Sequence, residues 1–518
     1  MLWVRNLPSW RGMEGLTAGL TLARAGLSRL VFGPLLLLLI VAGAAHPVGA
    51  TRAAALNPIQ AENALPGTTS WEVTSPSYHD EVEGYASRQS VYPGQTIRFS
   101  VRTTAPRFRL EIFRMGWYGG KGARLVFSQR GLTGHAYPIP TPNPKTGLLV
   151  CHWPAALSLQ VPRSWVTGIY LVKLSASNHH QAYIPFVVKE AQPRAPLVFV
   201  DTVATSEAYN FWGGKSLYVD VNAHSPQQQY ERRAVEVSFQ RPLAQNMGAG
   251  WFFSWEVHLV RWLERNGYDV AYVDDLDVND DPGLLLHRKA ILITGHDEYW
   301  SLAMRNAMDA AVAHGVSLGN LAANTGYWQI RFQRMGRNPD GIEICYKSFK
   351  RDPMHRRDPR LTTVTWRDPH VNRPESELLG AMYEDYLGNG TPFPWKVTAA
   401  RRWAVFKRAG VRPGTIVAKL VGPEEDAVLH GYPHPAGLHI LARSPVTNST
   451  GERRVSESTE YRAKSGAIVF DAGTIDWSQG LDVFRQPNWS YEPARKQPSA
   501  VIERVTANLL SAFEANTR

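Results

Sequence analysis

The spacing of apolar residues changes near residue 190, and this change restricts what the chain can fold into. Over residues 82–188 apolar side chains alternate with polar ones, as at Ile97, Phe99 and Val101. Short alternating runs separated by turn signals, with no helical stretch, are typical of a β-sandwich. After residue 197 the runs are fully apolar and alternate with helical stripes. That second pattern is typical of parallel strands joined by crossover helices.

We therefore predict an α/β protein in two parts. Residues 196–518 should form a mostly parallel, doubly wound sheet of the glutamine-amidotransferase or flavodoxin-like kind. An all-β, immunoglobulin-like sandwich over residues 79–190 should precede it. Residues 51–78 are rich in Ala, Pro, Ser and Thr, so we expect a tether there. The stretch 331–460 has weak periodicity, and the sequence does not place its elements.

The first 50 residues indicate export. Arginines precede a charge-free run from Leu30 to Ala45, and the small residues Val48-Gly49-Ala50 follow it. Two outcomes stay open, a cleaved signal peptide and a membrane anchor kept at residues 30–50. In both, the rest of the chain would lie in the cell envelope or outside the cell. Export permits a disulfide, but Cys151 and Cys345 fall in different predicted domains, so their pairing is not favoured.

A formal net charge of +11 raises the question of nucleic acid as a partner. Three of these charges belong to the export segment. A dense share of the rest lies between Arg331 and Arg360, where Lys347, Lys350, Arg351, Arg356 and Arg357 are interrupted by Asp340, Glu343, Asp352 and Asp358. Such a mixture favours a solvated insertion over a surface that follows phosphates. We predict no nucleic-acid partner.

Polar and aromatic side chains follow four of the predicted strands, over residues 201–218, 295–301, 324–328 and 471–477. Ligands bind beyond the carboxyl ends of strands in open parallel sheets, so we expect these tails to meet in one site. Motifs of α/β-hydrolases, of His-Glu-x-x-His zinc proteases and of nucleotide-binding loops are absent from the sequence. The remaining chemistry is rich in carboxylates and phenols, whose oxygen atoms suit hard cations.

Five motifs, in order along the chain, carry a resemblance to the N,N-dimethylformamidase large-subunit family. They are Gly84-Tyr85-Ala86-Ser87, Gly116-Trp117-Tyr118-Gly119-Gly120, Tyr209-Asn210-Phe211-Trp212-Gly213-Gly214, His296-Asp297-Glu298-Tyr299-Trp300 and Ala323-Asn324-Thr325-Gly326-Tyr327-Trp328. The resemblance covers roughly residues 80–515. It implies an amidohydrolase with one ferric iron held by two tyrosinates and one glutamate.

Carried over residue by residue, the resemblance makes Glu298 the glutamate ligand and Tyr209 the first tyrosinate. Tyr218 is the nearest candidate for the second tyrosinate. Leu243 stands where we would expect a tyrosine in some relatives, so the second ligand, the metal and the activity stay open.

The resemblance also implies roles around the metal. His296 would support it, Asn324 would donate to the developing oxyanion, and Asp476 would be the general base. Many relatives would have Glu at the last position, so this carboxylate is one methylene shorter. Four aromatic residues would form the wall of a pocket for a small amide: Trp300, Trp328, Tyr299 and Tyr327.

Each candidate has a structural alternative. Glu298 could cap the helix expected near Ser301, and Asp476 and Asn324 could be turn residues. The tyrosines, the tryptophans and His296 could be plain packing residues. The sequence thus predicts an exported metal-dependent amidohydrolase acting on a small linear amide. The alternative is an inactive envelope or binding protein, and the oligomeric state stays open.

Overall fold

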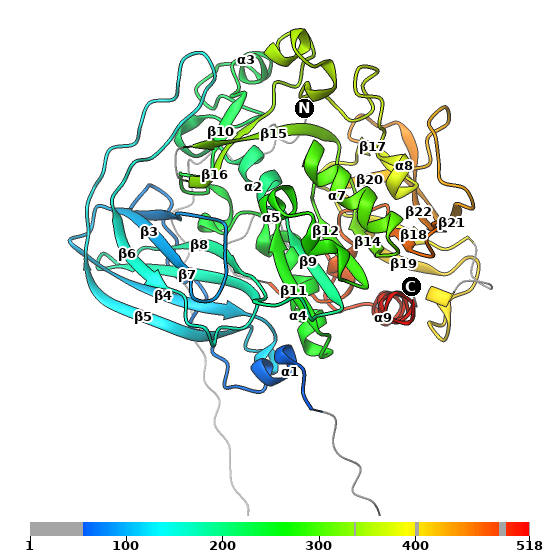
Figure 1. The fold of residues 1–518 in the computed structure, drawn as a ribbon, viewed down its shortest axis with the longest axis horizontal. Helices are drawn as coiled ribbons and strands as arrows, with labels where there is room; N and C mark the ends of the chain where they lie inside the picture. The colour runs from blue at the N-terminus through cyan, green and yellow to red at the C-terminus, as the bar shows by residue number, and fades with distance from the viewer. Residues whose placement is uncertain (1–54, 336–337, 399–403, 486–493, 517–518) are drawn as a thin grey trace, which may run out of the picture.

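The computed structural model describes residues 55–335, 338–398, 404–485 and 494–516, which form a mixed α/β structure with several sheets (Figure 1). The predicted α/β class is thus confirmed at this level. The finer assignment to flavodoxin-like and immunoglobulin-like folds stays a prediction.

The N-terminal region is built from two sheets. One has the strand order β2 (Ser90–Val91), β8 (Gln181–Val188), β7 (Gly168–Ala176), β4 (Arg107–Met115) and β5 (Ala123–Thr133). The other has the order β1 (Val82–Ala86), β3 (Thr96–Thr103) and β6 (Ala155–Gln160). The alternating residues of these strands bury one side, so Phe99, Ile112 and Phe186 share a hydrophobic core.

A seven-stranded sheet forms the centre of the C-terminal region. Its order is β11 (Val270–Asp274), β9 (Leu197–Asp201), β12 (Ala290–Gly295), β14 (Ser317–Ala322), β23 (Ile468–Asp471), β22 (Arg453–Arg462) and β21 (His439–Thr447). The first five strands are parallel, and β22 and β21 are antiparallel to their neighbours. The fully apolar runs in the sequence are these parallel strands, because helices cover both of their faces.

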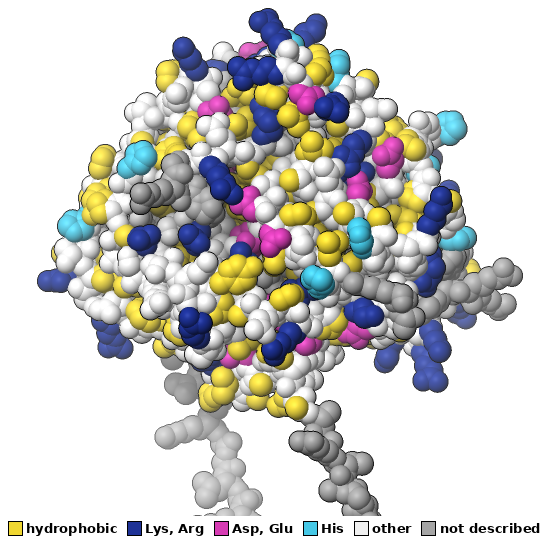
Figure 2. All heavy atoms as spheres, viewed as in Figure 1, with side chains coloured by type: hydrophobic (Ala, Val, Ile, Leu, Met, Phe, Trp, Pro, Cys, Tyr) yellow, Lys and Arg dark blue, Asp and Glu magenta, His cyan; other side chains and the backbone are white. Residues whose placement is uncertain are grey.

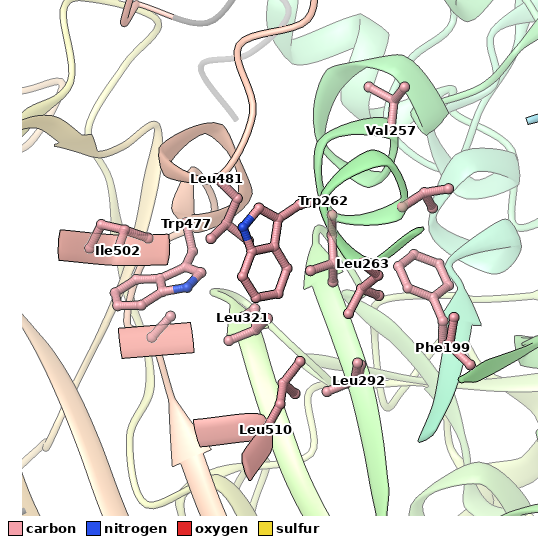
Figure 3. Close-up of a cluster of buried hydrophobic side chains, with 14 of the residues drawn as sticks. Phe199, Val257, Trp262, Leu263, Leu292, Leu321, Trp477, Leu481, Ile502 and Leu510 are labelled. Atoms are coloured by element: carbon pink, nitrogen blue, oxygen red, sulfur yellow. The ribbon is translucent and has the colours of Figure 1, made fainter. Parts of the chain in front are cut away.

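On one face, α4 (Val257–Arg265) and α9 (Ala500–Ala515) bury their apolar stripes. There Trp262, Leu263 and Leu510 pack on strand residues that include Leu292 (Figure 3). On the other face lie α5 (Asp275–Asp280), α6 (Gly283–Leu286) and α7 (Leu302–Ala313). A π-helical turn over Phe252–Glu256 leads directly into α4.

The remaining helices and strands are short and surround these sheets. The helices are α1 (Pro58–Asn63), α2 (Val203–Tyr209), α3 (Pro226–Glu231) and α8 (Ser376–Leu379). A four-stranded sheet has the order β10 (Glu236–Ser238), β16 (Asn338–Ile344), β15 (Trp328–Met335) and β13 (Tyr299–Ser301). Two pairs complete the set: β17 (Met382–Tyr386) with β20 (Glu424–Ala427), and β18 (Phe393–Lys396) with β19 (Ile416–Val421).

The segment predicted to be a tether is packed where the structure describes it. Residues 58–63 form α1, and Ile59, Trp71 and Val73 are at most 1% exposed. Their side chains belong to the same hydrophobic core as α4 and the face of the central sheet that α4 covers. Small and polar residues dominate the composition of this segment, so the few large apolar residues did not stand out in the sequence. Their burial holds the segment against the rest of the protein.

The predicted signal lies outside the described residues. Within the described ranges, no helix combines the length and apolar character needed to cross a bilayer. Cys151 and Cys345 are both buried free thiols, so the pairing that the sequence did not favour is not made.

The basic stretch is only partly the solvated insertion that we predicted. Figure 2 shows Lys and Arg side chains gathered at the top of the view, over the segment that follows β16, with acidic ones among them. Arg360, whose side chain is 80% exposed, pairs there with Asp358. Lys347 and Asp352, in contrast, are buried. The ion pair with Arg331, whose Nη1 lies 2.7 Å from Asp352, offsets the cost of burying the carboxylate.

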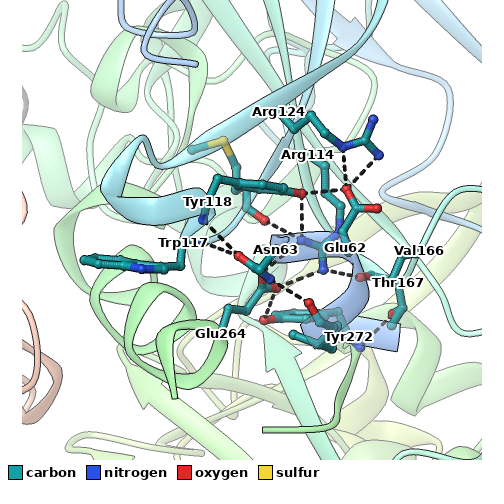
Figure 4. A network of polar contacts seen from close by, with 12 residues as sticks. Glu62, Asn63, Arg114, Trp117, Tyr118, Arg124, Val166, Thr167, Glu264 and Tyr272 are labelled. Atoms are coloured by element: carbon teal, nitrogen blue, oxygen red, sulfur yellow. Dashed lines mark hydrogen bonds and ion pairs between the residues drawn. The ribbon is translucent and has the colours of Figure 1, made fainter. Parts of the chain in front are cut away.

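A buried ion pair ties the N-terminal region to the C-terminal one. Arg114 on β4 donates from Nη1 and Nη2 to the two carboxylate oxygens of Glu264 on α4, both at 2.9 Å (Figure 4). Both side chains are 0% exposed. Burial opposes the charge of Arg114, but Glu264 outweighs that penalty and raises the pKa of the guanidinium.

Neighbouring groups add further hydrogen bonds to Glu264. Tyr272 on β11 donates to Glu264 at 3.0 Å, and Asn63 at the end of α1 donates to it at 2.7 Å. Gly116, from the Gly-Trp-Tyr-Gly-Gly motif, must lack a side chain because a Cβ would lie 2.2 Å from Glu264 Oε2. This motif therefore serves the connection between the regions.

We expect Arg114→Met to destabilise the protein by about 3–5 kcal/mol, because it leaves Glu264 buried without its charged partner. Urea unfolding of the full chain measures the change. The matched control is Arg109→Met, which breaks the partly exposed Arg109–Glu111 pair and should cost no more than about 1 kcal/mol. The double variant Arg114→Met/Glu264→Leu should recover part of the loss. Equal losses in Arg114→Met and Arg109→Met would contradict the role of the buried pair.

Candidate active site

A cavity of about 990 Å³ lies between the two regions of the protein. Residues of β1 and β8 line it from the N-terminal side, and the segments after β9, β12 and β14 line it from the central sheet. Three of the four tails predicted to meet thus contribute to one cavity. None of the described residues lining it belongs to the fourth tail, residues 471–477.

Local backbone geometry turns Glu298 toward this cavity. Gly295 ends β12 with φ of 74°, and a Cβ there would lie 2.4 Å from Trp255 Cβ. The backbone N–H of Glu298 donates to Thr205 Oγ1 on α2 at 2.9 Å. The glycine makes the tight turn possible, and the hydrogen bond fixes it against the neighbouring helix.

Two phenols and an imidazole meet at the buried Glu298 carboxylate. Tyr209 OH donates to Oε2 at 2.8 Å, and Tyr218 OH donates to Oε1 at 2.5 Å. His296 Nε2 lies 3.1 Å from Oε2. The two phenol rings are 4.4 Å apart between centroids. The structure therefore brings together the three residues that the resemblance marks as metal ligands.

Glu298 does not cap the following helix, which was its structural alternative. Ser301 is the N-cap of α7, because its hydroxyl accepts from Met304 N at 3.1 Å. Leu243 lines the cavity wall. Its presence does not remove a phenol from Glu298, because Tyr209 and Tyr218 are both in place.

Charge and burial set the pKa values around Glu298. Burial raises the pKa of the Tyr209 and Tyr218 phenols, and the Glu298 charge raises both further. Burial also opposes the charged form of Glu298, but hydrogen bonding and the charge of His296 outweigh it and lower the pKa. The site therefore favours a carboxylate with neutral phenols around it.

A second carboxylate, Glu424 on β20, lies beside His296. His296 Nδ1 is 3.6 Å from Glu424 Oε2, so the imidazole stands between the two glutamates. Asn324 Nδ2 donates to the same oxygen at 2.8 Å, and Asn324 N donates to Asp426 Oδ1 at 2.8 Å. Burial raises the pKa of Glu424, opposed by the charge of His296.

The amine of Lys347 lies at the same place. Its Nζ lies 3.1 Å from the centroid of the Tyr218 ring and 4.8 Å from that of Trp328. Burial lowers the pKa of this amine to about 7. Its Nζ has no hydrogen-bond partner among the described residues, so the aromatic faces are its main contacts.

The other predicted site residues divide into two groups. Tyr327 and Trp328 line the cavity. Trp300 belongs to the hydrophobic core on the α7 side of the central sheet, and Tyr299 packs behind the two phenols. Asp476 is buried, does not line the cavity, and accepts from Trp255 Nε1 at 3.0 Å.

Sequence reasoning missed Glu424 and Lys347. Both come from the stretch 331–460, whose short, irregular strands give no clear periodicity. The acidic triplet Glu424-Glu425-Asp426 in an otherwise apolar surrounding was the available signal for the first residue. For Lys347 the sequence suggested solvent, because charges of both signs surround it.

The side chains that could hold a metal ion in this site are oxygen donors. Among the described residues, no group of three or more His, Cys, Asp and Glu side chains is arranged to hold a metal ion. The converging groups are instead two phenols and one carboxylate, and oxygen donors of this kind suit a hard cation.

Comparisons with known proteins give a consistent result. The family described as N,N-dimethylformamidase beta subunit-like, C-terminal, matches residues 109–492. The N,N-dimethylformamidase beta subunit of Alcaligenes sp is 26% identical in an alignment 213 residues long, which covers 34% of this chain and 28% of that protein. The corresponding subunit of Paracoccus aminophilus is 24% identical over 214 residues, with the same two shares. The aligned part is less than a third of the length of these relatives.

Among solved structures, a cycloisomaltooligosaccharide glucanotransferase of Paenibacillus sp. covers 51% of this chain and 57% of its own. Its TM-score of 0.17 and 11% identity are too low to support a common fold. The family match, in contrast, spans most of the chain and includes Tyr209, Tyr218, Glu298 and Glu424. This protein therefore belongs to the N,N-dimethylformamidase beta subunit-like family.

Proposed function

We propose that the protein hydrolyses an amide at Glu298, in the cavity between its two regions. The observation that carries this proposal is the convergence of Tyr209, Tyr218 and His296 on one buried carboxylate. A second carboxylate, Glu424, lies within reach of the same imidazole. The relatives are named as dimethylformamidase subunits, which supports an amide as the reacting bond.

Tyr209, Tyr218 and Glu298 would hold a ferric ion. Their oxygens already meet, and the protons of the two phenols would leave as an ion takes their place against the carboxylate. When bound, such an ion supplies Lewis acidity to a carbonyl and to water. The three residues fit this role because all three donors are hard oxygens.

The other groups of the site hold and move protons. Glu424 takes a proton from the attacking water and returns it to the leaving nitrogen. Water adds to the carbonyl carbon and forms the new C–O bond, and the C–N bond then breaks as the nitrogen takes the proton, giving a carboxylic acid and an amine. Asn324 orients Glu424 through its hydrogen bond, and His296 orients Glu298. Lys347 Nζ lies over the face of the Tyr218 ring, where its protonated form would favour negative charge on that phenol.

Two carboxylates compete for the role of general base. The sequence pointed to Asp476, whose Oδ1 accepts from Trp255 away from the cavity lining. Glu424 lines the cavity and contacts both Asn324 and His296. A base must come within hydrogen-bond reach of the attacking water, so this geometry favours Glu424.

Two wider proposals, and the weight against a rival function, follow from the sequence and the relatives. Residues 1–50 would direct export, with the anchor or the cleaved signal as outcomes. The relatives are beta subunits, which supports assembly into a larger complex. The rival function of an inactive binding platform depends on an incomplete ligand set, and two phenols at Glu298 weigh against it.

We expect the purified full chain to carry one iron per chain and an absorption band from phenolate-to-iron charge transfer. Glu298→Gln should lose the iron and the colour, because it removes the charged donor. Asp476→Asn is the matched control, a buried carboxylate outside the cavity lining, and should keep both. Metal analysis and visible spectra measure the result. Equal iron in wild type and Glu298→Gln would remove Glu298 from the ligand set.

We expect Glu424→Gln to lower kcat for amide hydrolysis by roughly 10²- to 10⁴-fold, since it removes the proton acceptor. Its iron content should stay unchanged, and release of amine measures the rate. Asp476→Asn should keep most of the wild-type kcat. The reverse outcome, loss in Asp476→Asn and activity in Glu424→Gln, would return the general base to the residue that the sequence suggested.

A further inference from the structure

The cavity is far larger than a small amide needs. Its volume of about 990 Å³ corresponds to roughly thirty water molecules at about 30 Å³ each. N,N-Dimethylformamide has five non-hydrogen atoms and would displace only a few of these waters. Cavities near 1,000 Å³ are at the upper end of the range for drug-sized ligands, about 300–1,000 Å³.

Much of the extra wall comes from outside the central sheet. The segment 77–80, which precedes β1, lines the cavity together with Glu83 on β1 and Tyr183 on β8. Tyr78 is 45% exposed and Ile139 is 38% exposed, although both are large apolar residues. Exposed apolar side chains on the wall of a cavity are typical of surfaces that a ligand covers.

The segment with Tyr78 is held in place by its neighbours. Ser77 N donates to Gln181 O on β8 at 2.9 Å. Ser77 Oγ and His79 N both donate to Glu81 Oε2, at 3.0 and 2.8 Å. Tyr78 is therefore presented by a hydrogen-bonded turn. A wall fixed before binding costs little entropy when a ligand arrives.

Aromatic rings dominate the lining. Trp212 is anchored by a hydrogen bond from Nε1 to Glu83 Oε2 at 2.6 Å, and Trp251 packs edge-on against Tyr209. The lining rings, which come from both regions, are Tyr78, Tyr183, Tyr209, Phe211, Trp212, Tyr218, Tyr230, Trp251, Tyr327, Trp328, Tyr383 and Tyr386. Such walls favour flat or apolar ligand groups, which they can stack on.

The charges of the lining disfavour anionic ligands. Outside the proposed metal ligands, the lining has the acidic residues Asp80, Glu83 and Glu424, and Lys347 is the only lysine or arginine among the described residues that line the cavity. Glu83 is partly offset by Arg102, whose Nη1 is 3.3 Å away. The balance still favours an uncharged or cationic ligand over an anionic one.

We propose that the substrate is a bulky amide with an aromatic, uncharged or cationic body, held against the wall formed by residues 77–84, Ile139 and Trp212. This substrate class rests on the proposed amide hydrolysis at Glu298. The reacting bond lies at Glu298, and the N-terminal β region supplies the contacts that select the rest of the molecule.

The test compares three formamides on the full chain loaded with iron. They are N-methylformamide, N-(4-phenylbenzyl)formamide and the 4′-carboxylate of the second compound. Calorimetry measures binding, and amine release measures turnover. We expect the biphenyl compound to bind at least about 100-fold more tightly than N-methylformamide. The carboxylate should bind about 10-fold more weakly than its uncharged parent, because the lining is acidic.

The variant Tyr78→Ala tests how much the wall contributes to substrate binding. It should weaken binding of the biphenyl amide roughly 5- to 10-fold and raise its KM. Tyr432→Ala is the matched control, an exposed tyrosine that does not line the cavity. It should leave both compounds unaffected.

The outcomes separate the two proposals. Equal binding of the small and the biphenyl amide, or tighter binding of the carboxylate, would overturn the substrate class. Tyr78→Ala binding the biphenyl amide like wild type would overturn the assignment of the wall. Tight binding of the biphenyl amide without release of amine from any compound would support the wall and overturn the proposed hydrolysis alone.

Discussion

The ion pair between Arg114 and Glu264 fixes the geometry on which the cavity depends. It lies where β4 of the N-terminal region meets α4 of the C-terminal region, and both of its side chains are fully buried. A buried pair of this kind tolerates little displacement, because each charge is stable only at the other's hydrogen-bond distance. The wall bearing Tyr78 and Glu83 and the groups at Glu298 belong to opposite sides of that joint. Their separation is therefore set by packing and does not depend on a flexible linker.

The sequence predicted the reacting end of the site better than its surroundings. Glu298, His296, Tyr209 and Asn324 follow parallel strands, whose carboxyl ends meet at one edge of the sheet. Glu424 could not be placed in the same way, because β20 pairs with β17 in a small separate sheet. Long-range packing decides where the β17–β20 pair lies against the parallel sheet. The local periodicity of the sequence carries no information about that packing.

The same limit explains two other differences. Lys347 is surrounded in sequence by charges of both signs, yet in the structure it lies over aromatic rings. Residues 58–78 have the composition of a tether, but Trp71 alone contributes a large buried surface. In both cases the burial of one side chain differs from what the composition of the surrounding sequence suggests. The backbone of the site is also strained. Asn324 and Lys347 have φ of 56° and 52°, in the left-handed region, which costs conformational free energy for a lysine.

The packing of Trp71 bears on the order in which the chain can fold. Its ring stacks on Phe253 at 5.7 Å between centroids and contacts Phe484 at 5.5 Å. These partners are synthesised much later than Trp71, and Phe484 lies near the end of the chain. Contacts so distant in sequence form slowly, because closing the loop between them must precede any gain in stability. The segment around Trp71 is thus made long before its packing partners and is among the last parts to reach its native place.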